Sequence, residues 1–353
     1  MSRKILIIGP SINHSKGGMA TVIEGIVTDS KLNSKHSIDA HESYSDGNII
    51  YRIIFSIIAY IRFIFIYNKY DIFYIHMASY GSTFRKGYYI RFLNKRNKRI
   101  ILHVHGAEYI MFYNSLSESK KRKIENIWEK SDVIIALSEK WKIKFESIFR
   151  HKNIIVINNG IDIEQYKDAI CFLDEARNKF LFLGRIGIRK GAYDIVSAVE
   201  NLSKIYPEIL VYMAGDGEIN QIKSLIKEKK LDNNIEVIGW INFKNKIELL
   251  KKVSTVLLPS YNEGLPMSIL EGMASGKAII STDVGGIPEL VENNINGLVI
   301  SPGDISALSK AISKMIEDEK FVKRCSINNL EKIEFKFSRK KMHEKISAIF
   351  NNI

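Results

Sequence analysis

The sequence predicts an α/β protein with two doubly wound parallel-sheet domains, and three observations support this fold class. Short apolar runs such as 4–8 and 179–183 alternate with helical segments, and the alternation starts again in the second half. The 353 residues exceed what one ordinary hydrophobic core accommodates. A polar, glycine-containing turn at 158–162 separates the two halves. We therefore predict domains at 1–165 and 166–335 and a C-terminal helix at 336–353.

The net charge is +13, and the excess of basic residues is concentrated in the first half. Residues 1–165 contain 25 Lys and Arg against 15 Asp and Glu; because the whole chain has 52 and 39, residues 166–353 contain 27 against 24. A basic half predicts an anionic partner, which could be nucleic acid, anionic lipid or a phosphorylated substrate. The alternative is that the basic residues serve only solubility.

The cysteine content argues for a reducing compartment. Cys171 and Cys325 are too few for a disulfide framework. Neither lies in a CxxC or Cys/His pattern, so the sequence predicts no metal site. The N-terminal segment also lacks a signal-peptide cleavage pattern. These features predict a cytoplasmic protein.

The first predicted strand, residues 4–8, ends at Gly9 and leads through a loop into a helix that runs to about residue 27. Gly17 and Gly18 open that helix, and paired glycines allow the backbone to approach a ligand closely. No GxGxxG pattern follows the strand, so the dinucleotide-binding fingerprint is absent. On this evidence the pair is either a ligand-binding turn or an ordinary one.

Two segments of the first half predict contact with a membrane surface. Residues 49–67 are nearly all apolar, but Arg52 and Arg62 make insertion across a bilayer costly. We interpret them as a partly exposed helix on the bilayer surface; a core-packed helix and a true span are the alternatives. Residues 83–99 mix seven cations with aromatic and aliphatic side chains, which suits an anionic membrane or a lipid-linked diphosphate. A solvated basic face is the alternative, and no nucleic-acid-binding signature is present.

A histidine follows the predicted strand at 100–104. His105 stands at the carboxyl end of this strand, where α/β proteins bind ligands. His103 alternates with it and could be the inward-facing one instead, and either histidine could be structural. Downstream we predict strands at 132–137 and 154–157, a helix at 139–149 and a helix cap at Ser138.

The second half begins with a strand at 179–183 and a cationic loop. Arg185 and Lys190 flank this loop, and a guanidinium fork with an ammonium group can hold a diphosphate. The alternative is a positively charged loop without a ligand, and Arg189 has no assigned role. We also predict strands at 209–214 and 235–238, a glycine turn at Gly215 and a loop containing Trp240.

The segment 260–286 carries two carboxylates around a predicted helix start. Pro266 suits the first helical position and Gly276 the helix end, so Glu263 lies in the preceding loop and Glu271 within the helix. Helix N-terminal amides suit a phosphate, and a carboxylate accepts two hydrogen bonds from a diol. The layout fits a nucleotide sugar; an ordinary strand–loop–helix with solvated acids is the alternative. The remaining predicted elements are strands at 277–281 and 296–299, a helix opening at 285–289, and helices at 305–319, 320–333 and 338–350.

Glu263 and Glu271, with seven residues between them, match the E-x7-E motif of the family 4 glycosyltransferases, which the chain resembles over nearly its whole length. The glycine pair, the His-Gly at 105–106, the Asn-Gly-Ile-Asp at 159–162 and the cationic loop occur in the family's order. The resemblance implies the GT-B fold: two Rossmann-like domains facing a central cleft, the first binding the acceptor and the second the nucleotide sugar. It further implies that the last helix crosses back to the first domain.

The resemblance also implies roles for individual residues. Arg185 and Lys190 would stabilise the leaving diphosphate, and the backbone of Ile238 or Trp240 would flank the base. Glu263 would orient the donor sugar, Glu271 would hold the ribose diol, and His105 would bind the sugar or acceptor. The residues so implied for donor binding are Gly17, Gly18, Arg185, Lys190, Gly215, Ile238, Trp240, Glu263, Gly264, Leu265, Pro266 and Glu271.

The resemblance implies a retaining, metal-independent enzyme with no cofactor besides its donor. We expect it to move a hexose from a UDP- or GDP-linked sugar to a hydroxyl of a glycan acceptor. The basic, aromatic first half suggests a polyprenyl-diphosphate-linked precursor of lipopolysaccharide or capsule, at the anionic inner face of the cytoplasmic membrane, and no nucleic acid as partner. A GT-B sugar epimerase and a non-catalytic membrane- or nucleic-acid-binding scaffold are the alternatives.

Overall fold

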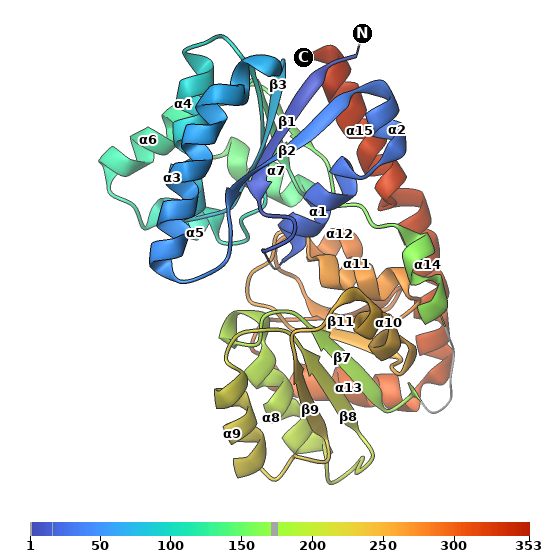
Figure 1. Ribbon diagram of the computed structural model, residues 1–353. Helices are drawn as coiled ribbons and strands as arrows, with labels where there is room; N and C mark the ends of the chain where they lie inside the picture. Colours follow the sequence, from blue (N-terminus) through green and yellow to red (C-terminus); the bar gives the residue numbers. More distant parts are fainter. Residues whose placement is uncertain (1, 16, 171–175) are drawn as a thin grey trace. The chain divides into compact units, whose positions relative to one another are not determined.

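The computed structural model describes residues 2–15, 17–170 and 176–353, so Cys171 lies outside the described residues. The chain divides into two compact units, the first formed by 1–160 with 339–353 and the second by 161–338. Each unit contains a parallel six-stranded sheet flanked by helices (Figure 1). The predicted α/β fold class with two parallel sheets is therefore confirmed.

The strand order in the first unit is β2-β1-β3-β4-β5-β6, and the pairings are parallel. The central strands are apolar throughout because helices cover both faces of a parallel sheet; β3, for example, is buried along its whole length. The strands are β1 (Lys4–Pro10), β2 (Ser37–Tyr44), β3 (Ile72–Met77), β4 (Arg99–Val104), β5 (Val133–Ala136) and β6 (Ile154–Val156).

Where the sequence has a helical period, the helices of the first unit lie at the predicted positions. The hydroxyl of Ser138 accepts a hydrogen bond from the Trp141 amide, which confirms the predicted cap, but the capped helix ends at Glu146 and not at residue 149. The helices are α1 (Gly18–Val27), α2 (Ser30–Lys35), α3 (Ile49–Ile66), the 3-10 turn η1 (Tyr67–Lys69), α4 (Gly81–Asn94), α5 (Tyr109–Asn114), α6 (Glu118–Glu129), α7 (Glu139–Glu146) and α15 (Arg339–Asn352).

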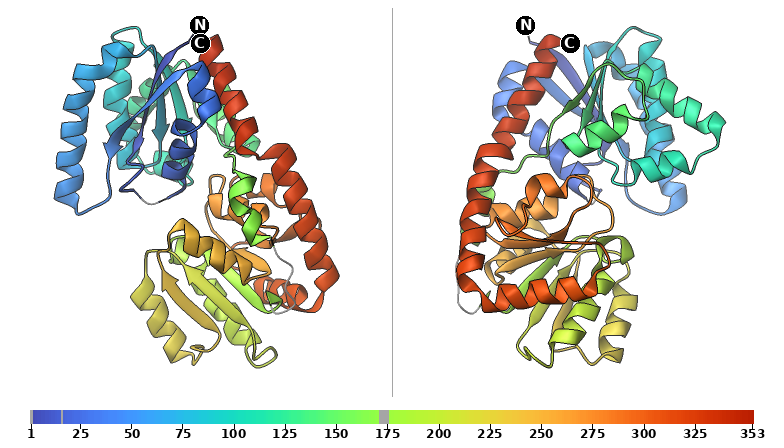
Figure 2. Two further views of the ribbon diagram at one scale, coloured as in Figure 1. Left: turned by 45° about the vertical axis from the view of Figure 1, so that its right-hand side comes forward. Right: turned by 180° about the vertical axis from the view of Figure 1, so that it is seen from behind.

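The C-terminal helix α15 is part of the first unit, where it packs beside α2 and the sheet (Figure 2). Its His343 lies 2.9 Å from a carboxylate oxygen of Asp29, and its Ser347 hydroxyl lies 3.3 Å from Nε2 of His36. Near its end, the ring of Phe350 meets Tyr74 of β3 edge-on at 5.7 Å. A segment distant in sequence thus completes the core of the first unit.

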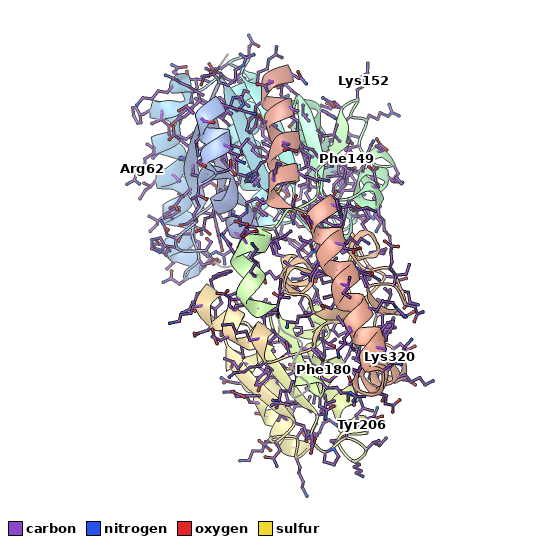
Figure 3. The ribbon with its side chains drawn as sticks, turned by 90° about the vertical axis from the view of Figure 1, so that its right-hand side faces the viewer. Arg62, Phe149, Lys152, Phe180, Tyr206 and Lys320 are labelled. Carbon is purple, nitrogen blue, oxygen red and sulfur yellow. The ribbon has the colours of Figure 1, made fainter. Side chains whose placement is uncertain are left out.

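Helix α3 is not a core-packed helix. Within α3, every residue of which the structure describes, the buried side chains are Ala59 and Phe63. The outward side is apolar, from Ile49 at 70% exposed to Phe65 at 81%, and Arg62 projects from it away from the sheet (Figure 3). The inward side packs on α4 through aromatic rings, which explains why so apolar a helix is still held to the unit.

The basic segment 83–99 is not a single helix with a solvated cationic face, which was the alternative interpretation of this segment. Helix α4 ends at Asn94, and the cations from Lys95 onward lie in the following turn and at the start of β4. Within α4, Lys86 is only 1% exposed, because the helix packs this face on the sheet and α6.

The second unit has the strand order β12-β11-β10-β7-β8-β9, again with parallel pairings. Its strands are β7 (Lys179–Leu183), β8 (Leu210–Ala214), β9 (Ile235–Gly239), β10 (Thr255–Leu258), β11 (Ala278–Thr282) and β12 (Gly297–Ile300). Its helices are η2 (Ile163–Ala169), η4 (Ile188–Lys190), α8 (Ala192–Leu202), α9 (Ile219–Glu228), α10 (Phe243–Lys251), α11 (Met267–Ala274), α12 (Ile287–Leu290), α13 (Ile305–Glu317) and α14 (Glu319–Lys336).

The helix that carries Glu271 begins and ends close to the predicted residues. Pro266 occupies the cap position of α11, one residue before the predicted place, with φ −71° and an extended ψ. Gly276 follows the C-cap with φ +65°, the left-handed conformation that favours glycine at a helix end. Glu263 therefore lies in the β10–α11 loop and Glu271 inside α11, as predicted.

Candidate active site

The strand order of the second sheet reverses between β7 and β10, and most predicted donor residues follow these strands or β8. In open α/β sheets, ligands bind beyond the carboxyl ends of the strands at such a reversal. The loop after β7 carries Arg185 and Lys190, and the loop after β10 carries Glu263. The fold therefore brings the two predicted loops to the same sheet edge.

Glu263 and Lys190 form a buried ion pair at this edge. The Lys190 ammonium lies 2.5 Å from Oε1 of Glu263, which is only 5% exposed. The Ser260 hydroxyl donates a 2.7 Å hydrogen bond to the same oxygen. The sequence predicted Lys190 as a diphosphate ligand and Glu263 as a sugar ligand; in the structure each is the ion-pair partner of the other.

Glu271 has a cationic partner that the sequence analysis missed. Lys246 of α10 places its ammonium 2.6 Å from Oε1 of Glu271, a carboxylate that is 6% exposed. Lys246 lies on a different helix, 25 residues away in sequence. No motif marks it, so only the packing of α10 against this region reveals it.

The loop that holds Glu263 is braced from both sides. Arg189 had no predicted role. Its guanidinium donates a 3.0 Å hydrogen bond to the Asn262 carbonyl, and its backbone carbonyl accepts a 2.9 Å hydrogen bond from the Tyr261 amide. On the other side Gly285 has φ +55°, and a Cβ there would lie 1.9 Å from the Glu263 carbonyl oxygen. A glycine is therefore required at this position for the loop after β11 to approach the Glu263 backbone so closely. These contacts fix the backbone that orients Glu263.

Arg185 is more exposed than Lys190 and lies beside an acid. Its guanidinium is 3.4 Å from the Asp216 carboxylate, and the Asp216 carbonyl accepts a 2.6 Å hydrogen bond from the Ile186 amide. Asp216 thus closes the turn after β8 and also forms an exposed ion pair with Arg185. The adjacent Gly215 has φ +159° and sits against the Gly184 carbonyl, where a Cβ would lie 1.8 Å away.

The other predicted donor residues of the second unit differ in exposure. Gly264, Leu265 and Pro266 are buried and lead directly into α11. Ile238 is half-buried in β9, and Trp240 just beyond it is 55% exposed. Since β9 is an edge strand two places from β7, these two residues lie further from the reversal point than the Lys190–Glu263 pair does.

In the first unit the glycine pair is exposed at the start of α1. Gly17 has φ +128°, a conformation that L side chains rarely adopt, and there is open space where its Cβ would be. Gly18 begins the helix. Both glycines follow β1, next to the point where the order of the first sheet reverses between β1 and β3.

His105 is one of three neighbouring histidines, and it is the accessible one. His103 is completely buried, and its Nδ1 lies 2.7 Å from the Tyr74 hydroxyl. His105 is half-buried, with Nε2 2.9 Å from Nδ1 of His76. The sequence left the choice between His103 and His105 open; the geometry leaves His105 within reach of a ligand and makes His103 part of the core.

Burial keeps these histidines neutral. Desolvation lowers the pKa of His105 to about 3, and it lowers the pKa of His76 and His103 well below the ordinary value, with the neighbouring histidines adding to the effect. Neutral imidazoles can each donate and accept one hydrogen bond, so His105 can serve a sugar hydroxyl in either direction.

The same three histidines are the group that could hold a metal ion in the part of the chain that the structure describes. One ring nitrogen from each lies within 4.8 Å of the others, and neutral imidazole is a common ligand of zinc and similar ions. The sequence predicted no metal site because neither cysteine lies in a CxxC or Cys/His pattern. The three histidines come from two strands and form no spaced motif. That expectation stays a prediction, and these side chains are where a metal test should look.

Two family models match the chain. The model described as "Glycosyl transferases group 1" matches residues 164–332, and the model described as "Glycosyltransferase Family 4" matches residues 35–165. The two matches lie side by side and follow the two units closely. The chain belongs to the group 1, family 4 glycosyltransferases.

Curated relatives of the chain are bacterial and archaeal. It is 28% identical over 251 residues to an uncharacterized glycosyltransferase of Methanocaldococcus jannaschii, covering 69% of this chain and 64% of the relative. It is 30% identical over 211 residues to the UDP-Gal:alpha-D-GlcNAc-diphosphoundecaprenol alpha-1,3-galactosyltransferase of Escherichia coli, covering 56% and 54%. The chain thus spans between half and two thirds of the length of these relatives.

Solved structures with the same fold cover essentially the whole chain. Sucrose-phosphate synthase from Thermosynechococcus elongatus aligns with a TM-score of 0.83 at 17% identity, over 99% of this chain and 98% of that one. HepE from Anabaena in complex with UDP-glucose aligns with a TM-score of 0.80 at 18% identity, over 99% and 100%. The fold is the GT-B fold.

Proposed function

We propose that this chain is a retaining hexosyltransferase that moves a sugar from a UDP- or GDP-linked donor to a glycan hydroxyl. The observation that carries the proposal is the pair of buried carboxylates, Glu263 and Glu271, each held by a lysine from another element at one sheet edge. Two buried, charge-compensated acids are costly to maintain for stability alone. When a donor binds, each carboxylate would release its lysine and accept hydrogen bonds from hydroxyl groups of the donor instead.

Each group in the second unit has a part in the reaction. Glu271 accepts hydrogen bonds from the ribose diol of the nucleotide, and Glu263 accepts them from the sugar. Lys190, drawn from Glu263 toward the donor, joins Arg185 and the amides at the start of α8 and α11 around the diphosphate. These positive groups stabilise the charge that develops on the leaving group and take the place of a metal.

The reaction retains the anomeric configuration because the acceptor attacks the face of the sugar that the diphosphate leaves. The bond between the anomeric carbon and the diphosphate oxygen breaks, and the bond to the acceptor oxygen forms on that face. The acceptor proton passes to the leaving diphosphate oxygen. Glu263 then orients the sugar and is neither base nor nucleophile, and neutral His105 hydrogen-bonds the sugar or acceptor hydroxyl.

The proposed acceptor is a polyprenyl-diphosphate-linked precursor of a bacterial surface polysaccharide, such as lipopolysaccharide or capsule. Two relatives support this class by their names: the Escherichia coli enzyme acts on a diphosphoundecaprenol-linked sugar, and CapM of Staphylococcus aureus belongs to capsular polysaccharide biosynthesis. HepE, which shares the fold, binds UDP-glucose.

We also propose that the protein works at the anionic cytoplasmic face of the membrane. The helical segment Ile49–Lys69 is long and apolar enough to cross a bilayer, and 11% of its most apolar stretch is buried. Arg52 and Arg62 make a true span costly, so the exposed isoleucines of α3 fit a helix lying in the interface.

The first test is a thermal-shift and turnover screen with UDP, GDP and ADP and their sugars, in buffer containing EDTA. We expect one nucleotide to stabilise the protein, and Glu271→Gln and Lys190→Ala to abolish that shift. Lys251→Ala is a matched control, since Lys251 pairs with Glu248 on the surface. Slow hydrolysis of one donor in EDTA supports the transferase without metal.

Other outcomes count against the proposal. Stabilisation by a nucleotide sugar whose configuration changes without any transfer would identify an epimerase. No response to any nucleotide, with binding to duplex DNA that weakens steeply with salt, would identify a non-catalytic scaffold.

A further inference from the structure

A cluster of cationic and aromatic side chains lies at the carboxyl edge of the first sheet. Tyr44 ends β2, and the guanidinium carbons of Arg52 and Arg85 lie 5.1 and 4.7 Å from the centre of its ring. Arg52 comes from the first turn of α3 and Arg85 from the second turn of α4. Two cations from separate helices thus converge on one aromatic ring.

The Arg85 guanidinium lacks the anion that a buried cation needs. Its Nε is buried and has no hydrogen-bond partner. Burial lowers the pKa of Arg85, and the charge of Arg52 acts in the same direction. Across residues 2–15, 17–170 and 176–353, neither arginine forms an ion pair. A buried, unsatisfied donor of this kind requires an explanation, and a bound anion supplies one.

Lys86 is a third basic side chain, next to Arg85 in α4. It is buried and bonds to the Ser43 hydroxyl, which in turn donates a 2.7 Å hydrogen bond to the Gly9 carbonyl. Burial lowers the pKa of Lys86 well below its ordinary value. The acid nearby is Asp46, an exposed carboxylate that the Tyr44 hydroxyl approaches. Two guanidinium groups against one exposed acid leave this edge electropositive.

An apolar surface adjoins the cluster. Ile49, Ile50 and Ile53 surround Arg52 in the first turns of α3 and are 70%, 68% and 55% exposed. A free phosphate or a nucleotide would leave these side chains in water. A ligand that joins a diphosphate to a hydrocarbon chain would use the cations and the isoleucines together.

We propose that Arg52 and Arg85, held against Tyr44, bind the diphosphate of a polyprenyl-diphosphate-linked acceptor, and that the isoleucines at the start of α3 contact its hydrocarbon chain. The inference rests on the transferase function proposed above and assigns its acceptor site. Two guanidinium forks can engage both phosphates, and the Tyr44 ring keeps the two like charges in place by cation–π contact.

Farnesyl diphosphate, a short water-soluble isoprenoid diphosphate, is the probe for a calorimetric binding test on the full chain. We expect Arg52→Gln and Arg85→Gln each to raise Kd about tenfold, the effect of one lost charge-assisted contact. Arg91→Gln, on the same helix as Arg85, should stay within about twofold of the unaltered protein. Arg85→Lys keeps the charge without the fork and should recover only part of the affinity.

Binding measurements with further ligands show whether the bound anion is a lipid-linked diphosphate, a free diphosphate or a lipid headgroup. Inorganic diphosphate should bind more weakly than farnesyl diphosphate but with the same dependence on Arg85, and farnesol should bind more weakly than either. Phosphatidylglycerol vesicles should capture the unaltered protein and Arg85→Gln equally. Equal affinity for inorganic and farnesyl diphosphate would overturn the lipid-linked assignment. Vesicle binding that falls in step with Arg52→Gln and Arg85→Gln would make the cluster a lipid-headgroup site instead.

The result is independent of the donor test. If Arg52→Gln and Arg85→Gln bind farnesyl diphosphate like the unaltered protein, the acceptor site is wrong even where nucleotides bind as expected. If no nucleotide binds while farnesyl diphosphate still depends on both arginines, the transfer reaction fails and the anion site stands. An unchanged nucleotide-induced thermal shift in each variant shows that it is folded.

Discussion

The carboxyl edges of the two sheets differ in whether their charged side chains have partners of opposite charge. In the second unit the cations Lys190 and Lys246 meet buried carboxylates, and Arg185 meets Asp216. In the first unit the corresponding edge has neutral histidines, and its two arginines, Arg52 and Arg85, form no ion pair within the described residues. Each of these cations in the second unit has an acidic partner within the protein, and under the function proposed above a donor would bind by replacing those partners. The first edge is incomplete, and an anion from outside would complete it.

The largest expected effect comes from breaking a pair on the second edge. Glu263→Ala leaves the Lys190 ammonium, 14% exposed, without its partner. We expect the free energy of unfolding to fall by about 3 kcal/mol and transfer to be lost. Denaturant unfolding with a turnover assay measures both, and Glu248→Ala, from an exposed pair, should cost less than about 1 kcal/mol.

A double variant sharpens this result. Glu263→Leu combined with Lys190→Met removes both charges and should recover most of the stability but none of the activity. If Glu263→Ala is as stable as the unaltered protein, the ion pair does not compensate buried charge and the comparison between the edges fails.

Acid should destabilise the first unit more than the second. All eight histidines lie in 1–160 and 339–353. Burial lowers the pKa of His41 to about 4 and of His105 to about 3. Below the ordinary pKa of 6.5 these histidines are protonated in the unfolded chain but stay neutral in the folded one. The free energy of unfolding therefore falls as the pH drops from 6.5 toward 4, by up to about 1.4 kcal/mol per pH unit for each such histidine.

Hydrogen exchange followed by mass spectrometry between pH 7 and pH 4 resolves the two units. Peptides of the first unit should lose protection first, and His41→Gln should reduce the slope. Equal loss in both units would show that the carboxylates of the second unit, not the histidines, govern acid unfolding.

A smaller effect is expected from Lys246→Met, which leaves Glu271 without its 2.6 Å partner. Because Glu271 would then lose the group that orients its carboxylate, KM for the donor should rise about tenfold, with a smaller change in kcat. Steady-state kinetics with varied donor test this, and Lys251→Met serves as the control. A change confined to kcat would remove Glu271 from donor binding.

The smallest expected effect has the opposite sign. Lys86→Met on the first edge replaces an uncompensated buried cation with an apolar side chain of similar length, so stability should rise by about 1 kcal/mol. Thermal or denaturant unfolding measures it. A clear loss of stability would mean that the bond of Lys86 to Ser43 matters more than the burial of its charge.

The sequence was sufficient where local rules decide the structure. Apolar runs predicted the strands of both sheet centres, and Pro266 with Gly276 placed α11 within one residue. It was insufficient at the edge strand β2, whose buried side chains include His41 and Ser43 and which shows no continuous apolar run. A polar strand is recognisable only once its neighbour β1 is known.

The site shows the same division. Motif residues such as Glu263 and Lys190 could be named from spacing, but their direct contact could not. Lys246, Arg189 and the three-histidine group depend on which elements lie side by side, and a single sequence does not carry that information. For a related reason the sequence did not distinguish the buried Lys86 from the other cations of 83–99, because its burial follows from helix packing and not from composition.

The place of α15 has a consequence for synthesis. Phe350 and His343 complete contacts with residues near the start of the chain, so the first unit cannot finish folding until 161–338 have left the ribosome. The second unit is continuous in sequence and can fold as soon as it emerges. During that interval, the first sheet lacks the cover of α15, while the outward face of α3 is exposed, as it is in the finished unit as well. The nascent chain is therefore most vulnerable to aggregation just before its final helix docks, and removing α15 would make that state permanent.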